Sequence, residues 1–193
     1  MNLELFEKLR EERPSQQVPE WRTFLEICEV YLKRNNIKNP VVVELGTYFD
    51  RQKRFYQQLL NADHIGIDIG SKRSIPDICG DTHDLETLKK LKKRLANRPI
   101  NILFIDADHS YESVKKDYEI YAPLCTDIIA LHDIELYRCE SRRDKEVWKF
   151  WDELKAASFT EREGLDRCLF LTISQHQFEN KRRKMGIGMI IKK

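Results

Sequence analysis

Short apolar runs alternate with amphipathic stretches from residue 41 to the end of the chain, and this alternation most constrains the fold. The predicted strands cover 41–45, 64–68, 75–80, 100–106, 127–132 and 187–191, and the predicted helices cover 51–61, 84–97, 111–121 and 144–157. β-Branched runs such as Val41 to Val43 suit parallel strands that are buried on both faces. Strands alternating with helices predict an α/β fold, a doubly wound, mostly parallel sheet with helices on both faces.

The first 35 residues have a helical pattern instead. Their apolar residues recur at the three- and four-residue steps that place side chains on one helix face. These residues are Trp21, Phe24, Leu25, Cys28 and Leu32. Asn35 and Asn36 then end the helical pattern, and Pro40 begins the next element. We therefore expect an N-terminal helical extension over residues 1–38, followed by an α/β domain over residues 39–193.

Three later segments carry more specific expectations. In the predicted helix 84–97, an inward face of Leu85, Leu88, Leu91 and Leu95 lies opposite a lysine-rich outer face. A further short strand is expected at 159–161. The segment 164–185 has no pattern that assigns it to a helix or a strand.

The composition restricts the class of protein. The chain has 193 residues, of which 41% are hydrophobic, and a formal net charge of +2, so it offers no general attraction for nucleic acid or acidic membranes. It has no apolar run near the ~18 residues of a membrane span, and its N-terminus is unlike a signal peptide. The five cysteines include no C-x-x-C pair, which argues against a disulfide framework or a four-thiolate zinc site. We therefore expect a cytoplasmic protein.

Polar residues gather where each predicted strand ends. Right-handed crossovers bring the C-terminal ends of parallel strands to one edge, and such sheets bind ligands along that edge. The candidate site residues there are Glu44, Gly46, Thr47, Tyr48, Asp68, Gly80, Asp81, Thr82, Asp106, Asp108, His109, Tyr111, His132 and Asp133. A structural alternative remains open, because Asp and Gly also form turns and Asp also caps helices.

Two features of this edge indicate the kind of ligand. Asp68 follows the first strand by about 20 residues, the offset at which an acidic residue accepts hydrogen bonds from ribose hydroxyls. The loop after the first strand contains only Gly46, with Asp50 and Arg51 where a pyrophosphate-binding loop has further glycines. This loop argues against NAD or FAD and suits S-adenosylmethionine, which has an adenosine but no phosphate.

Several segments resemble the class I S-adenosylmethionine-dependent methyltransferases, in the branch of sugar and macrolide O-methyltransferases and cephalosporin-hydroxylase-like proteins. These segments are VVVELGTYFD, HIGIDIG, CGDTHD, LFIDADHSYESVKKDYEIYAPL, IIALHDI, KEVWKFWDELK and the closing GIGMIIKK. The resemblance implies a Rossmann-like domain that binds S-adenosylmethionine.

The resemblance also implies a role for each matching residue. Glu44, Gly46, Thr47 and Tyr48 would surround the methionine part, and Asp68 would hold the ribose. Gly80, Asp81 and Thr82 would lie near the adenine, and Asp106, Asp108, His109 and Tyr111 would line the catalytic edge. This chain departs from the family pattern at Asp50, where the family has Gly, and at Ile134, where metal-dependent relatives have Asn.

The candidate chemistry is methyl transfer to oxygen, with Asp106, His109 and Asp133 as catalytic residues. His109 is the candidate general base, because its ordinary pKa of about 6.5 suits proton abstraction near neutrality. A divalent ion, Mg²⁺ in particular, would bind Asp106 and Asp133, with His132 as a third candidate ligand. The alternative is that these carboxylates only cap helices.

The leading functional hypothesis is an O-methyltransferase acting on a small hydroxylated, sugar-like acceptor. One alternative is a non-catalytic S-adenosylmethionine-binding protein that has lost its base or metal site, as Asp50 and Ile134 suggest. Another is an RNA methyltransferase or RNA binder, which the basic run 181–184 suggests. We expect no membrane partner, and the sequence leaves open whether the chain forms a homo-oligomer.

Overall fold

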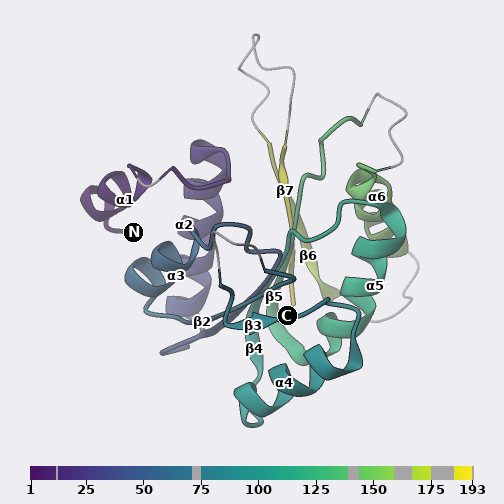
Figure 1. Ribbon diagram of the computed structural model, residues 1–193. Helices are drawn as coiled ribbons and strands as arrows, with labels where there is room; N and C mark the ends of the chain where they lie inside the picture. Colours follow the sequence, from purple (N-terminus) through teal and green to yellow (C-terminus); the bar gives the residue numbers. More distant parts are fainter. Residues whose placement is uncertain (12, 71–74, 139–143, 159–166, 175–184, 193) are drawn as a thin grey trace.

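A single mixed sheet forms the centre of the protein (Figure 1). The computed structural model describes residues 1–11, 13–70, 75–138, 144–158, 167–174 and 185–192. Within them the strands are β1 (Val41–Leu45), β2 (Asp63–Asp68), β3 (Ile78–Cys79), β4 (Ile100–Ile105), β5 (Cys125–His132), β6 (Leu169–Ile173) and β7 (Ile187–Ile191). Their order in the sheet is β3-β2-β1-β4-β5-β7-β6.

The first five strands all run parallel, and β7 runs antiparallel to its neighbours β5 and β6. The strand order reverses at β1, whose neighbours are β2 and β4. In a doubly wound sheet this reversal opens a crevice at the C-terminal ends of the strands. The predicted α/β class and mostly parallel sheet are therefore confirmed.

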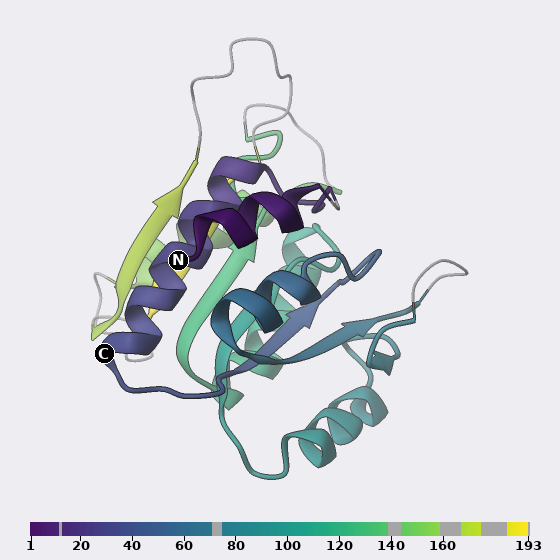
Figure 2. The same ribbon diagram turned by 90° about the vertical axis from the view of Figure 1, so that its left-hand side faces the viewer.

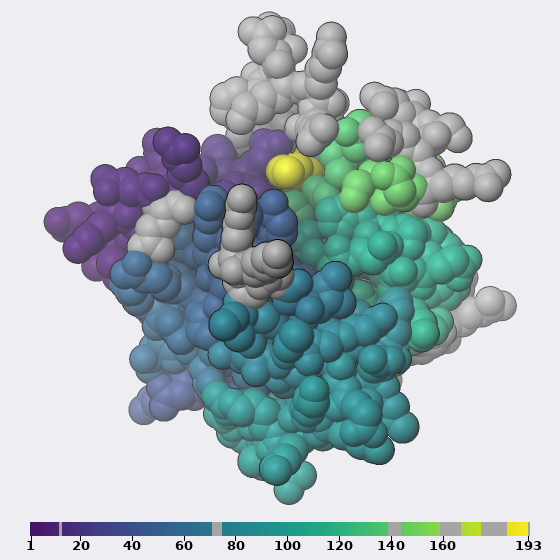
Figure 3. Space-filling model, in the orientation of Figure 1, coloured from purple at the N-terminus to yellow at the C-terminus, as the bar shows by residue number. Residues whose placement is uncertain are grey.

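Helices cover both faces of the sheet (Figures 1 and 2). One layer contains α1 (Leu3–Arg10), α2 (Val18–Arg34) and α3 (Lys53–Leu60), and the other contains α4 (Leu85–Leu95), α5 (Tyr111–Tyr121) and α6 (Val147–Ser158). The N-terminal helices and the α5–α6 pair lie on opposite sides of the space-filling view (Figure 3). Strand β1 contacts both helix layers. The side chain of Val42 packs in one hydrophobic core, and those of Val41 and Val43 pack in the other.

The N-terminal helices pack directly on the sheet. All five residues of the predicted helix face are buried, and Trp21 stacks on Phe24 and meets Phe104 of β4 edge-on at 5.7 Å.

The helical pattern is interrupted between α1 and α2. Pro14 disfavours helix at the residue before it, and Arg13 has a left-handed φ of 54°. The intervening segment crosses toward the C-terminal edge of the sheet.

Some sequence expectations differ from the structure. Leu85 is 64% exposed, because it is the first residue of α4 and extends beyond the contact between helix and sheet. The other predicted positions are confirmed, since Leu91 and Leu95 are buried and Leu88 packs against the core, and Thr87 is buried beside them. Strand β6 lies inside the segment 164–185, which had no assigned element. The strand expected at 159–161 and the basic run 181–184 lie outside the described residues.

Candidate functional site

A cavity of about 710 Å³ lies at the C-terminal edge of the sheet, where the topology predicts a ligand. We call it the edge cavity. Of the predicted site residues, eleven line it: Gly46, Tyr48, Asp68, Gly80, Asp81, Thr82, Asp106, Asp108, His109, His132 and Asp133. Glu44, Thr47 and Tyr111 are absent from its lining.

The loop after β1 is held close to the end of β4. Gly46 has a φ of +83° and donates its backbone N–H to Ile67 O at 2.8 Å. A Cβ at this position would lie 2.2 Å from the carbonyl oxygen of Asp106, a distance that no side chain tolerates. Glycine is therefore required here for close backbone packing, and this packing leaves room for a ligand beside the loop.

Asp68 ties this loop to the end of β2. Its Oδ2 accepts the backbone N–H of Tyr48 at 2.9 Å, and its Oδ1 accepts that of Gly70 at 2.9 Å. Ile69 beside it also lines the cavity and is 74% exposed. The carboxylate thus sits at the cavity wall with lone pairs left for further donors.

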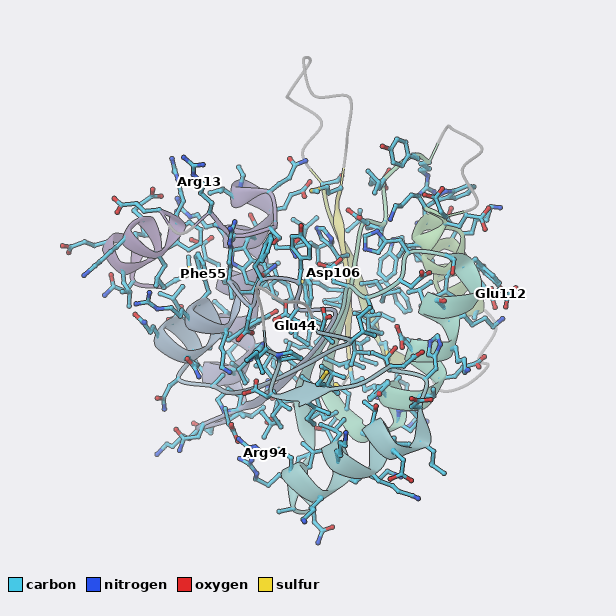
Figure 4. All side chains as sticks on the ribbon, viewed as in Figure 1. Arg13, Glu44, Phe55, Arg94, Asp106 and Glu112 are labelled. Atoms are coloured by element: carbon cyan, nitrogen blue, oxygen red, sulfur yellow. The ribbon has the colours of Figure 1, made fainter. Side chains whose placement is uncertain are left out.

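Glu44 and Thr47 point away from the edge cavity into the protein. Both are fully buried, and Glu44 Oε2 lies 2.8 Å from His64 Nε2 (Figure 4). Burial raises the pKa of Glu44, although His64 opposes this shift. Glu44 therefore forms a buried pair beneath the loop, a different place from the one that the resemblance implies.

The far end of the cavity is formed by residues after β3 and by α5. Thr82 O accepts the hydroxyl of Tyr121 at 2.7 Å, and the backbone N–H of His83 donates to Asp81 Oδ1 at 2.8 Å. His83 Nε2 lies 3.3 Å from its hydrogen-bond partner, the backbone oxygen of Ser113, and 3.3 Å from Oδ1 of Asp117, which is fully buried on α5. His83 is thereby held against the cavity wall.

At the opposite end lie Asp106, His109, His132 and Asp133, which we call the Asp106 cluster. His109 Nε2 is 3.3 Å from Asp106 Oδ1, and His109 Nδ1 is 3.0 Å from Asp133 Oδ2. His132 Nδ1 is 2.9 Å from Asp106 Oδ1. Lys145 Nζ lies 3.1 Å from His109 Nδ1, so the segment before α6 also reaches this cluster.

Charge pairing sets the protonation of the Asp106 cluster. Burial lowers the pKa of His109, but its hydrogen bonds to Asp106 and Asp133 outweigh burial and raise that pKa to about 10. Burial also lowers the pKa of His132, but the attraction of Asp106 and Asp133 outweighs burial and raises that pKa to about 9. Burial raises the pKa of Asp106, but His132 and His109 outweigh it and hold that pKa well below its usual range. The two carboxylates therefore favour the protonated form of both imidazoles.

Three residues of this cluster are arranged to hold a cation. Asp106, His109 and Asp133 each offer one ligand atom, and these atoms lie within 4.8 Å of one another. The sequence analysis named His132 in place of His109 as the third ligand. The side chain of Ile134 is fully buried in the apolar core and offers no ligand atom.

Tyr111 faces α6 and not the cavity. Its hydroxyl hydrogen-bonds with Glu153 and Lys115, and its ring meets Phe150 edge-on at 6.2 Å. Several lining residues were missed by the sequence analysis, namely Ser15, Gln52, Ile69, His83, Ala107, Ser113 and Met185. Ile69 and His83 had a usable signal, because each directly follows a predicted site residue, whereas Ser15 had none.

The sheet order and the edge cavity define a Rossmann-like ligand-binding protein. Residues 43–134 match the model of a family described as "Methyltransferase domain". This match, which covers a little less than half of the chain, confirms the resemblance to the class I methyltransferases. No curated protein sequence matches the chain.

Solved structures share the fold at low sequence identity. The O-methyltransferase TomG from Streptomyces achromogenes, in complex with S-adenosylmethionine, has a TM-score of 0.66 at 10% identity, over 97% of this chain and 89% of that one. An O-methyltransferase from Bacillus cereus, in complex with S-adenosylhomocysteine, has a TM-score of 0.61 at 12% identity, over 98% and 88%.

The methyltransferase MycE of the mycinamycin biosynthetic pathway, in complex with Mg, S-adenosylhomocysteine and mycinamycin VI, has a TM-score of 0.58 at 16% identity. The match covers 86% of this chain and 48% of MycE, so this chain spans about half of MycE's length. Across the residues that the structure describes, no helix has the length and apolar character needed to cross a membrane.

Proposed function

We propose that the protein is an S-adenosylmethionine-dependent methyltransferase that methylates a hydroxyl oxygen of a small acceptor. The observation that carries this proposal is the edge cavity, which has Asp68 and His83 on one side and the Asp106 cluster on the other. Most of the residues that line this cavity belong to the segment 43–134, which matches the methyltransferase model. The crystallised relatives with S-adenosylmethionine or S-adenosylhomocysteine support the choice of cofactor.

In this proposal Asp68 binds the two ribose hydroxyls. Each of its oxygens already accepts one backbone N–H and has a lone pair left for a hydroxyl. The adenine lies between Ile69 and the segment Gly80–His83, and the methionine part lies along Gly46 and Tyr48. The sulfonium methyl group then points toward the Asp106 cluster.

Methyl transfer is an in-line displacement. A C–O bond to the acceptor forms while the methyl–sulfur bond breaks, which leaves S-adenosylhomocysteine, and the hydroxyl proton must be removed. His109 borders the cavity where the acceptor hydroxyl would lie, between Asp106 and Asp133. In the cation-free site it orients the hydroxyl and, once it has lost its own proton, accepts the hydroxyl proton; with a cation bound, His109 is a ligand and does not act as the base.

The Asp106 cluster fits a divalent cation. Its two carboxylates and the imidazole of His109 offer oxygen and nitrogen ligand atoms within 4.8 Å of one another, a donor set that suits such an ion. Asp106, Asp133 and His109 would hold it, and when bound it supplies Lewis-acid chemistry that lowers the pKa of the acceptor hydroxyl.

The acceptor that we propose is small and hydroxylated, and sugar-like. The cavity volume of about 710 Å³ must hold both the cofactor and the reacting part of the acceptor. Binding pockets for single small molecules span ~300–1,000 Å³, so little space remains for a second large ligand. MycE, which was crystallised with mycinamycin VI and S-adenosylhomocysteine, is an example of this fold with a second small molecule beside the cofactor product.

One alternative is a protein that binds S-adenosylmethionine without turnover. The observation that favours it is Ile134, which is fully buried and offers no ligand atom beside Asp133. The RNA alternative depends on the run 181–184, which lies outside the described residues.

Calorimetric titration with S-adenosylhomocysteine tests the cofactor. We expect micromolar binding, and the absence of binding to the folded protein would contradict the proposal. Transfer of a labelled methyl group from S-adenosylmethionine to a panel of hydroxylated acceptors tests the reaction. Binding without transfer to any member of the panel would favour the non-catalytic alternative.

A further inference from the structure

The segment between α1 and α2 reaches the Asp106 cluster from the N-terminal part of the chain. Ser15 lines the edge cavity, and Arg51 Nη1 donates to the backbone oxygen of Arg13 at 3.0 Å, which holds the segment against the loop after β1. Residues far from the methyltransferase motifs in sequence therefore form one wall of the site.

Gln16 is the residue of this segment that enters the cluster. Its side chain is 4% exposed, and its Nε2 donates to Asp106 Oδ2 at 2.8 Å. The other oxygen of Asp106, Oδ1, faces His109 and His132. Gln16 thus contacts the one carboxylate oxygen that neither imidazole faces.

The amide oxygen of Gln16, Oε1, has no hydrogen-bond donor among the described residues. This oxygen is also buried. A buried carbonyl oxygen without a donor has lost its hydrogen bonds to water and gained none, so buried polar atoms of this kind are rare. A half-turn of the amide group would exchange Oε1 and Nε2 and place the oxygen beside Asp106.

The spacing at Asp106 suits a shared cation. Two neighbouring oxygens on an octahedral divalent ion, each 2.0–2.1 Å from it, lie about 2.9 Å apart. The amide atom of Gln16 and Asp106 Oδ2 are 2.8 Å apart, and the ligand atoms of Asp106, His109 and Asp133 lie within 4.8 Å of one another. Carboxylate, amide and imidazole ligands together suit Mn²⁺ or Mg²⁺.

We propose that Gln16 is a fourth ligand of a divalent cation held by Asp106, His109 and Asp133, and that this cation fastens the N-terminal segment over the edge cavity. The inference deepens the proposed function and rests on it for the purpose of the site. Cation binding is then coupled to closure of the wall that contains Ser15. The same contact makes the N-terminal helices part of the active site.

The test is a calorimetric titration of the full chain with MnCl₂, without cofactor or acceptor. Gln16→Ala is expected to weaken Mn²⁺ binding about 10-fold or more, the usual effect of removing a group that supports a metal site. Gln58→Ala, which removes an exposed amide on α3, serves as the matched control and should leave the affinity unchanged. Circular dichroism verifies that each variant is folded.

Gln16→Glu separates a ligand from a simple hydrogen-bond donor. A carboxylate at this position keeps an oxygen ligand and adds negative charge, so it should bind Mn²⁺ at least as tightly as the wild type. If Gln16 only donates a hydrogen bond to Asp106, Gln16→Glu removes that donor and places a second carboxylate beside Asp106. The position of Asp106 would then be disturbed, and Mn²⁺ binding would weaken. Weakened Mn²⁺ binding in Gln16→Glu, or wild-type affinity in Gln16→Ala, would overturn the inference.

Limited proteolysis reports on the segment itself. Mn²⁺ should slow tryptic cleavage after Arg10, the residue that ends α1 just before this segment, in the wild type but not in Gln16→Ala, and equal protection of both would overturn the inference. A wild-type protein that binds S-adenosylhomocysteine but no Mn²⁺ overturns the inference and leaves the proposed function standing. A protein that binds Mn²⁺ with the predicted dependence on Gln16, but no S-adenosylhomocysteine, overturns the proposed function alone.

Discussion

The backbone N–H of Tyr48 donates a 2.9 Å hydrogen bond to Asp68 Oδ2, and this bond joins the loops that follow β1 and β2. Tyr48 has a left-handed φ of 50°, a conformation that costs a residue other than glycine roughly 1–2 kcal/mol. The hydrogen bond from Tyr48, together with the one from Gly70 to Asp68 Oδ1, offsets part of that cost. Asp68 therefore shapes the cavity wall as well as offering acceptors to a ligand.

Replacing Asp68 with Ala should weaken binding of S-adenosylhomocysteine by about 10-fold or more. Each hydrogen bond to a charged group contributes about 1.5–3 kcal/mol, and two ribose hydroxyls would lose their acceptor. Calorimetric titration measures the change. Asp84→Ala is the control, because Asp84 is exposed and lies outside the cavity lining. Unchanged affinity in Asp68→Ala would place the ribose elsewhere.

Gly46→Ala should destabilise the protein more than Gly70→Ala does. Both glycines have a φ near +80°, so both variants share the cost of a left-handed alanine, about 1–2 kcal/mol. Only at position 46 does the new Cβ meet backbone, at 2.2 Å from Asp106 O; at position 70 the nearest atom is Cys79 Sγ at 3.2 Å. We expect an additional loss of about 2 kcal/mol or more in urea unfolding of Gly46→Ala. Equal losses would show that the loop can move away from β4.

Much of the fold is predictable because its strands are buried on both faces. Val41 to Leu45 are all apolar except Glu44, and all five are buried, so the run marks both the strand and its place in the sheet. The edge strand β6 is not buried on both faces. Its Leu169 is 47% exposed, and only Ile173 is fully buried, because an edge strand contacts fewer neighbours.

The site is predictable only where strand ends carry it. Asp68, Asp106 and Asp133 each follow a recognisable strand, and the topology brings them to one edge. Gln16 has no such signal, since its position depends on how the chain turns between α1 and α2. Glu44 was predicted as a site residue because it lies near the end of β1, but its side chain is buried. Gly46, two residues later, lines the cavity.

His64 should give the protein a pH-dependent stability that Glu44 and Asp77 create. Burial lowers the pKa of His64, but its hydrogen bonds to Asp77 and Glu44 outweigh burial, and the attraction of Asp50 adds to them, so that pKa is about 9. The ring of Tyr56 stacks on it at 5.3 Å. Since the ordinary pKa is about 6.5, this contribution is complete below pH 6.5 and is lost as the pH rises through 9.

Urea unfolding between pH 6 and pH 9.5 measures this contribution. The wild type should lose on the order of 3 kcal/mol over that range, and His64→Gln should lose much less. Because Glu44 would be left buried without its partner, the double variant Glu44→Gln/His64→Gln is the control for overall destabilisation. Parallel loss of stability in all three proteins would assign the pH dependence to other groups.

Asp117 should lower the stability of the protein at neutral pH while supporting its proposed function. It is fully buried, and burial raises its pKa to about 6, whereas its Oδ1 lies 3.3 Å from His83 Nε2 on the cavity wall. The folded-state pKa lies above the ordinary value of about 3.9, so stability is lost as the pH rises through 6. Perturbed carboxylates of this kind are typical of functional sites.

Asp117→Asn tests both sides of this relationship. Removing the charge should stabilise the protein by on the order of 2 kcal/mol at pH 8 and by about half as much at pH 5, as measured by urea unfolding. The same variant should bind S-adenosylhomocysteine more weakly, because an amide holds His83 against the cavity less firmly than a carboxylate does. If the variant is less stable at pH 8, the pairing with His83 outweighs the burial of the charge, and Asp117 stabilises the fold at neutral pH.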